Sequence, residues 1–285
     1  MSNLPQNCSK IIGYAVIGSG EAQRYLRATL DEFKRLADHT VIVGNNISAN
    51  ERQMIAEYGF ELIEDYREWG TSQHKIKQDL MYYLAKYEPT YLICLDGDEV
   101  FDPTLTREKL IEMLDKYNAL YFYIVNLWNE GWSRKWSFWN IRAWKWNGDT
   151  RILNKPLHCG LAPEWCYYYA SYVPYFVKHY GLMKKEDRQK KIERYQKFDP
   201  KAQYKDKAYY DALASDDCEQ IDETFIRQAL EKEVGIQKAK KIAEVKPKKW
   251  FNVKNPQGKI IDVPEHLLAE TIARRGFILI GEIGK

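Results

Sequence analysis

Residues 91–101 read YLICLDGDEVF, and this stretch decides the fold. An apolar strand, residues 91–95, runs directly into three carboxylates, Asp96, Asp98 and Glu99. Like charges this close repel one another, so a shared cation would stabilise them. Mg²⁺ and Mn²⁺ take carboxylate oxygens together with the oxygens of a bound diphosphate. The stretch therefore predicts a metal site after a buried strand, with a solvated acidic turn as the alternative.

The segments before this stretch alternate between strand-like and helix-like patterns. Apolar runs predict strands, and apolar residues spaced three and four apart predict amphipathic helices. Strands and helices alternate, starting with a strand, over residues 10–16, 21–37, 40–43, 50–58, 60–63, 71–86 and 91–95. This order predicts an α/β fold with a mostly parallel sheet and helices on both faces. Ligands of such sheets bind beyond the carboxyl ends of the strands, which is where the acidic cluster falls.

The composition excludes several classes of protein. With 285 residues, 45% hydrophobic and 29% charged, the chain is typical of a globular protein. A net charge of +3 argues against nucleic acid as a partner. Five cysteines without CxxC spacing predict neither a disulfide framework nor a zinc site. No signal peptide is apparent and no apolar run approaches the ~20 residues of a membrane span, so we expect a cytoplasmic protein.

Two segments together resemble family-2 glycosyltransferases of the GT-A fold. The first segment, YLICLDGDEVF, is similar to a strand of this family that is followed by the pattern D-x-D-E. The second segment is residues 179–195, HYGLMKKEDRQKKIERY. It resembles a strand that ends in H-x-G and leads into a basic helix with a K-x-x-R-Y ending. Between these two segments, one branch of the family has an R-L-F-like strand and an L-H-E segment. In this chain, Ile141-Arg142 stands at the place of the first and Leu157-His158 at the place of the second. The resemblance covers roughly residues 10–200 and implies a GT-A fold with a Rossmann-like, mostly parallel sheet.

The resemblance also implies roles at the metal. Asp98 and His179 would bind Mn²⁺ or Mg²⁺, and Asp96 would hold the ribose or a metal-bound water. On the helix after His179, Arg188 and Lys191 share one face. Such a face can neutralise a leaving diphosphate, although a solvated charged helix is the alternative for each residue.

Two further residues are candidates for contacts with the nucleotide. Asp65 ends the third predicted strand and could accept a hydrogen bond from the base. Lys75 lies on the helix that leads into the acidic motif.

The resemblance implies an inverting glycosyltransferase of the hexosyltransferase type. A base would remove the acceptor proton while the metal holds the diphosphate of the donor, a UDP-sugar being favoured. Glu164 is the preferred base among Glu130, Asp149 and Glu164, because it follows the loop at His158. Cys159 stands where the branch has Glu, so the base is left open. The acceptor would be a glycan or a protein.

The tryptophans crowd between residues 127 and 147. Six of them, at positions 128, 132, 136, 139, 144 and 146, could form a stacking platform for a sugar acceptor or fill the core. We expect some of these tryptophans to be buried in the core and one or two of them to line the cleft.

The chain divides into three predicted parts: the GT-A domain over residues 1–200, a helical connector over 201–248, and a small ββαβ unit over 249–285. The last part resembles short segments of tailed-phage structural proteins, which implies a tether to a virion component or to a second copy. A hairpin that caps the catalytic domain is the alternative. If phage-encoded, the protein would act in the host cytoplasm or the virion.

The sequence is also compatible with two other functions. One is a virion structural or adhesion protein that keeps the GT-A fold without catalysis. The other is a nucleotidyltransferase, which would use the same acidic metal site.

Overall fold

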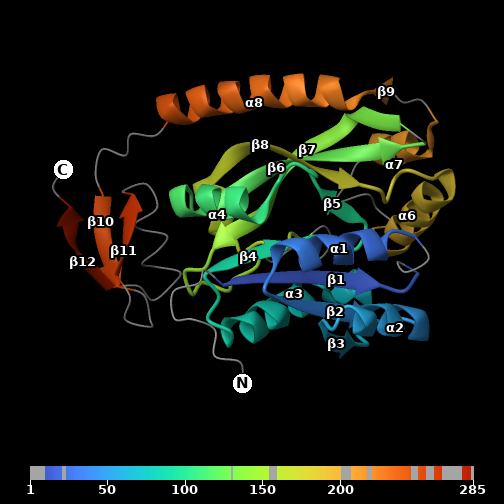
Figure 1. The fold of residues 1–285 in the computed structure, drawn as a ribbon, viewed down its shortest axis with the longest axis horizontal. Helices are drawn as coiled ribbons and strands as arrows, with labels where there is room; N and C mark the ends of the chain where they lie inside the picture. The colour runs from blue at the N-terminus through green and yellow to red at the C-terminus, as the bar shows by residue number, and fades with distance from the viewer. Residues whose placement is uncertain are drawn as a thin grey trace. The chain divides into compact units, whose positions relative to one another are not determined.

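The computed structural model (Figure 1) describes residues 10–20, 24–129, 131–153, 159–199, 207–216, 220–244, 250–254, 260–264 and 278–283. The chain forms two compact units, Met1–Val234 and Gly235–Lys285. The domain limits expected at residues 200 and 248 stay predictions.

The first unit is built on one large sheet. Its strands are β1 (Ile11–Gly18), β2 (His39–Asn45), β3 (Glu61–Asp65), β4 (Tyr91–Cys94), β5 (Glu99–Phe101), β6 (Ala119–Trp128), β7 (Gly131–Lys145), β8 (Ala170–His179) and β9 (Gln220–Ile221). Their order is β3-β2-β1-β4-β7-β6-β8-β5, with β9 paired to β7. Strands β3, β2, β1 and β4 are parallel, and β6 and β8 run the same way, whereas β7 and β5 run against them. The α/β fold predicted from the sequence, with a Rossmann-like, mostly parallel sheet and helices on both faces, is confirmed.

Helices connect and cover these strands. They are α1 (Leu26–Leu36), α2 (Ala49–Glu57), α3 (Trp69–Ala85), α4 (Arg107–Lys116), α5 (Cys166–Tyr169), α6 (Lys185–Phe198) and α7 (Lys207–Ala214). A further helix, α8 (Glu223–Glu244), begins in the first unit and ends in the second. The predicted helices over residues 50–58 and 71–86 correspond to α2 and α3, and the predicted basic helix corresponds to α6. None of the helices, as far as their residues are described, is long and apolar enough to cross a bilayer.

The central strand β1 is buried on both faces. Side chains alternate along a strand, so Ile11, Ala15 and Ile17 enter one core while Ile12, Tyr14 and Val16 enter the other. The first core takes its helical residues from α1, α2 and α4, and the second from α3 and α5. A strand covered on both faces reads as a continuous apolar run, which is why residues 11–17 show no polar alternation.

The pairing of β8 brings together segments that are far apart in the sequence. β5 pairs antiparallel with β8, with Glu99 opposite His179. β6 pairs parallel with β8, with Asn126 opposite the same histidine. The acidic turn between β4 and β5 therefore lies next to the end of β8.

The second unit contains a three-stranded antiparallel sheet. Its strands, β10 (Trp250–Lys254), β11 (Ile260–Pro264) and β12 (Ile278–Ile283), are ordered β11-β10-β12. The predicted hairpin and last strand are present. The predicted turn at residues 255–258 and the predicted helix after Pro264 lie outside the described residues.

Replacing Phe33 with alanine tests the core under α1. Phe33 is fully buried between α1 and β1, so Phe33→Ala should lower the free energy of unfolding by about 3–5 kcal/mol. The exposed neighbour provides the control, because Lys34→Ala should change it by less than about 0.5 kcal/mol. Denaturant titration followed by tryptophan fluorescence measures both values, and equal effects would contradict this account of the core.

Candidate functional site

A cleft of about 810 Å³ lies at the carboxyl ends of β1, β2 and β4. The acidic turn, Asp96 to Glu99, forms one wall, and His179 at the end of β8 adjoins it. Helix α6 contributes Lys191 and Arg194, and α3 contributes Trp69, Gln73 and Lys77. The cleft is thus where an open α/β sheet is expected to bind its ligand.

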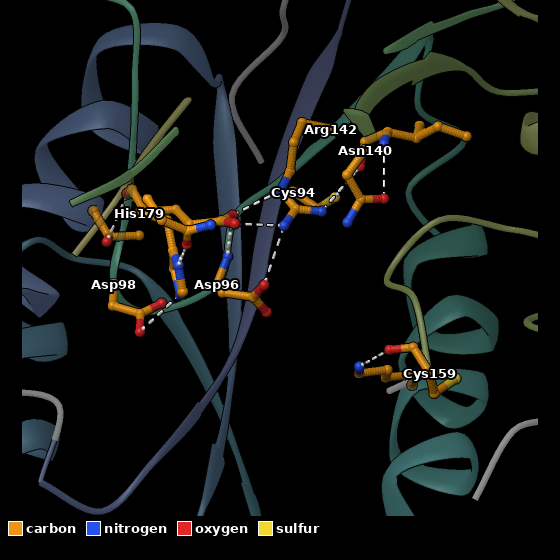
Figure 2. Close-up of polar contacts among 12 residues, drawn as sticks. Cys94, Asp96, Asp98, Asn140, Arg142, Cys159 and His179 are labelled. Carbon is orange, nitrogen blue, oxygen red and sulfur yellow. Dashed lines mark hydrogen bonds and ion pairs between the residues drawn. The ribbon is translucent and has the colours of Figure 1, made fainter. Parts of the chain in front are cut away.

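Asp98 and His179 form the centre of this wall (Figure 2). Nε2 of His179 lies 3.4 Å from Oδ2 of Asp98. On the other side of the ring, Nδ1 donates to Oδ1 of Asn126, which fixes the ring and directs Nε2 at the carboxylate. Burial would raise the pKa of Asp98, but the charges of His179, Lys191 and Arg24 outweigh burial and lower it. Asp98 is therefore held as a carboxylate.

Gly181 leaves space beside both of these atoms. A Cβ at this position would lie 2.0 Å from Oδ2 of Asp98 and 2.9 Å from Nε2 of His179. The backbone is fixed there, because the N–H of Tyr180 donates to the carbonyl oxygen of Asp98 at 2.8 Å. The glycine of the H-x-G segment thus keeps a gap open against the two predicted metal ligands.

The donor atoms in this gap suit a divalent cation shared with a ligand. Over the part of the chain that the structure describes, no three His, Cys, Asp or Glu side chains converge as a complete metal site. Asp98 and His179 supply one carboxylate oxygen and one imidazole nitrogen. Mg²⁺ is commonly held by one or two carboxylates plus substrate phosphates, and Mn²⁺ accepts the same oxygen donors. The residues present therefore fit a cation whose remaining ligands come from a diphosphate or water.

Arg142 organises the rest of the acidic turn from β7. Its Nε and Nη2 donate to both oxygens of Glu99 at 2.7 and 2.5 Å, and both side chains are almost fully buried. Nη2 also lies 3.1 Å from Oδ2 of Asp96, whose side chain is 47% exposed. Glu99 in turn accepts the backbone N–H of Asp96 at 3.0 Å. Arg142 thus neutralises Glu99 and orients Asp96 at the cleft (Figure 2).

The two predicted cations of α6 are placed differently. Lys191 lines the cleft, and its positive charge helps to lower the pKa of Asp98. Arg188 does not line it, because its guanidinium is buried 4.3 Å from the ring of Trp128 and pairs with Asp216 at 2.7 Å. It also donates to the carbonyl oxygens of Leu182 and Met183 in the turn before α6, so its contacts stabilise the packing of this helix.

The predicted nucleotide residues lie behind or outside the cleft wall. Asp65 accepts from Nε of Arg67 at 2.8 Å and from Asn45 at 3.1 Å, and Asn45 lines the cleft in its place. Burial would raise the pKa of Asp65, but hydrogen bonds from Arg67 lower it. Lys75 is exposed on α3 and does not line the cleft. The nucleotide roles of Asp65 and Lys75 stay predictions.

The predicted base does not line the cleft either. Glu164 is partly buried in a turn, where its backbone N–H donates to the carbonyl oxygen of Arg151. Of the other candidates, Asp149 pairs with Arg151 at 2.6 Å, and Glu130 is outside the described residues. The turn of Glu164 follows Leu161, which does line the cleft.

The tryptophan-rich segment contributes mainly to the core. Trp128 and Trp144 are fully buried, and Trp139 packs against Tyr123 and Tyr172. The side chains of Trp132 and Trp136 lie outside the described ones. Among the tryptophan side chains that the structure describes, Trp69 of α3 lines the cleft, and it is outside this segment.

Sequence reasoning missed several cleft residues that helical and strand patterns could have indicated. Trp69, Gln73 and Lys77 are spaced by four along α3, so they share a face. Arg142 is a lone cation in the buried run of β7, and such a cation needs a buried partner. Asn126 gave no signal, because only the pairing of β6 with β8 places it at His179.

Comparison with known proteins gives likenesses to solved structures alone. No family model and no curated protein matches the chain. Staphylococcus aureus TarS is similar at a TM-score of 0.31 and 11% identity, over 42% of this chain and 22% of that one. Glucosyl-3-phosphoglycerate synthase from Mycobacterium tuberculosis, solved with Mn²⁺, UDP and glucosyl-3-phosphoglycerate, is similar at 0.29 and 11%, over 41% of this chain and 44% of that one.

A third similar structure is a CMP:2-keto-3-deoxy-manno-octonic acid synthetase with CTP, at a TM-score of 0.28 and 14% identity. It covers 41% of this chain and 53% of that one, so the chain spans less than two thirds of each of these three proteins. The expected likeness of the C-terminal segment to tailed-phage proteins finds no support in these comparisons.

Adding a methyl group at Gly181 tests the gap. Gly181→Ala should weaken Mn²⁺ binding in the presence of a nucleoside diphosphate by about tenfold or more, because its Cβ would displace both predicted ligands. Isothermal titration calorimetry measures the affinity. Gly235→Ala is the matched control, since a Cβ there meets nothing within 4 Å. Unchanged Mn²⁺ affinity in Gly181→Ala would rule out a metal in this gap.

Removing one partner of the buried ion pair tests the role of Arg142. Arg142→Met leaves Glu99 buried and unpaired, so it should cost about 3–5 kcal/mol of stability. Replacing both partners, Arg142→Met with Glu99→Leu, should recover most of this loss because no charge is left unpaired. Denaturant titration of the two variants compares these values, and a double variant no more stable than the single one would contradict the pairing.

Proposed function

We propose that this protein is a metal-dependent glycosyltransferase that moves a sugar from a nucleoside diphosphate donor, with a UDP-sugar favoured, to a glycan or protein acceptor. The observation that carries the proposal is the meeting of Asp98 and His179 at 3.4 Å, beside the gap at Gly181, in a cleft of about 810 Å³. A cation there would share its coordination with a diphosphate.

The donor half of the site has residues that would serve the metal, the diphosphate and the ribose of a nucleoside diphosphate. Asp98 and His179 would hold the metal, and Asn126 keeps the imidazole directed at it. The bound metal would supply positive charge where the diphosphate departs. Lys191 faces the same region and adds charge on the phosphate side. Asp96, oriented by Arg142, is free on its cleft side to accept hydrogen bonds from ribose hydroxyls.

The proposed reaction is an inverting displacement at the anomeric carbon. The acceptor oxygen forms a bond to that carbon, the bond from the carbon to the diphosphate breaks, and a base takes the acceptor proton. We retain Glu164 as the proposed base, three residues after Leu161 of the cleft wall. The C-terminal unit stays a proposed tether to a partner or a second copy.

The metal-site carboxylate provides the test of this function. Incubation with UDP- and GDP-sugars and Mn²⁺ should release nucleoside diphosphate, detected by mass spectrometry. Asp98→Asn should lower this release about a hundredfold or more, because the metal loses its charged ligand. Asp211→Asn, an exposed change on α7, is the matched control and should behave as the wild type.

The released product separates this function from nucleotidyl transfer, which the same metal site would also serve. Release of pyrophosphate from a nucleoside triphosphate would assign the protein to the nucleotidyltransferases. If no nucleotide shifts the thermal unfolding of the wild type with Mn²⁺, the proposed metal-diphosphate site is wrong.

A further inference from the structure

Strand β5 directly follows the acidic turn, yet it is only three residues long and lies at one edge of the large sheet. Among the described strands it pairs with β8 alone, with Glu99 opposite His179 at one end of the ladder. At the other end, the backbone N–H of Asp102 donates to the carbonyl oxygen of Phe176 at 2.9 Å. A two-stranded ladder of this length is not stable by itself, so other contacts must hold β5 in place.

Arg227 of α8 contacts the end of this ladder that is remote from the cleft. Its Nη1 and Nη2 donate to Oδ2 and Oδ1 of Asp102 at 2.9 and 3.0 Å. Its guanidinium also lies 5.1 Å from the ring centre of Phe176, so Arg227 touches both strands of the ladder. The side chain of Asp102 is fully buried, and over the described residues its only ion pair is this one. A buried carboxylate depends strongly on such a partner.

Helix α8 presents Arg227 from a fixed position. Ile226, Leu230 and Val234 follow one another at about one turn along the helix, and all three are buried. Ile226 packs with side chains of β6 and β8. Nη2 of Arg227 also donates to Glu223, one turn earlier on α8, at 2.7 Å. The guanidinium is therefore oriented by its own helix, and the helix is packed on the sheet.

The same short strand connects this ion pair to the metal gap. Asp102 lies three residues after Glu99, which corresponds to roughly 10 Å along an extended strand. A shift of β5 relative to β8 at Asp102 would therefore also move Asp98 relative to His179, because one residue of each pair belongs to each side of the ladder. A site that binds a metal tolerates errors of only about 0.5 Å in the positions of its ligands.

We propose that Arg227 is a positioning residue for the metal site, which holds β5 against β8 and thereby fixes the spacing of Asp98 and His179. The inference rests on the proposed function for the role of the metal, but the effect on β5 can be measured without metal. Helix α8 continues into the second unit, so the proposed tether and the metal site share one helix.

Hydrogen exchange of the full chain, followed by mass spectrometry, tests whether Arg227 holds β5. In Arg227→Met the amides of residues 96–102 should exchange at least about tenfold faster than in the wild type, because the ladder opens more often. The amides of β2, residues 39–45, are the internal control and should be unchanged. If Arg227→Met does not fold, Arg227→Gln takes its place, because it can still donate one hydrogen bond to Asp102. Unchanged exchange at residues 96–102 would overturn the inference.

Isothermal titration with Mn²⁺ in the presence of UDP or GDP tests the effect on the site, at a temperature where every variant is folded. Arg227→Met should bind Mn²⁺ about tenfold more weakly than the wild type. Arg227→Lys keeps the charge and should lose less than about threefold. Leu230→Ala is the matched control, because it removes a buried contact of the same helix but keeps the ion pair. It should bind Mn²⁺ as the wild type does.

The outcomes separate this inference from the proposed function. Equal weakening by Arg227→Met and Leu230→Ala would overturn the inference, because the affinity would then follow stability alone. Faster exchange in Arg227→Met with an unchanged Mn²⁺ affinity would also overturn it and leave the proposed function standing. A wild type that binds no Mn²⁺ with either nucleotide would overturn the proposed function and, with it, the role of Arg227 at a metal.

Discussion

The buried ion pair between Arg142 and Glu99 is the contact on which the site depends. Three carboxylates within four residues could not face one cleft without strong repulsion. Arg142 binds both oxygens of Glu99 inside the protein and reaches Asp96 at the surface of the cleft. One negative charge is thereby neutralised in the core, and two remain directed at the ligand. The pair also links the acidic turn to β7, a strand more than forty residues later in the chain.

The antiparallel pairing of β5 with β8 then completes the metal side. It sets Glu99 opposite His179, so Asp98 lies beside the imidazole, while β6 brings Asn126 to the other ring nitrogen. A hydrogen bond at Nδ1 leaves Nε2 to face the carboxylate. Gly181 keeps the space open at the same place. Three strands and one glycine therefore create a gap that fits a cation shared with a diphosphate.

The sequence by itself determined the α/β order and the place of the acidic motif, because strand and helix periodicity and a polar stretch after an apolar run are local properties. It also indicated the H-x-G segment. Only the tertiary structure decided which charged side chains face the cleft. Lys191 and Arg188 lie one turn apart on α6, yet one lines the cleft and the other packs on Trp128. On α3 the exposed Lys75 was the candidate, whereas the buried Lys77 lines the cleft. The physical reason is that the direction of a helical side chain follows from spacing, whereas what it meets there depends on the elements that pack against the helix.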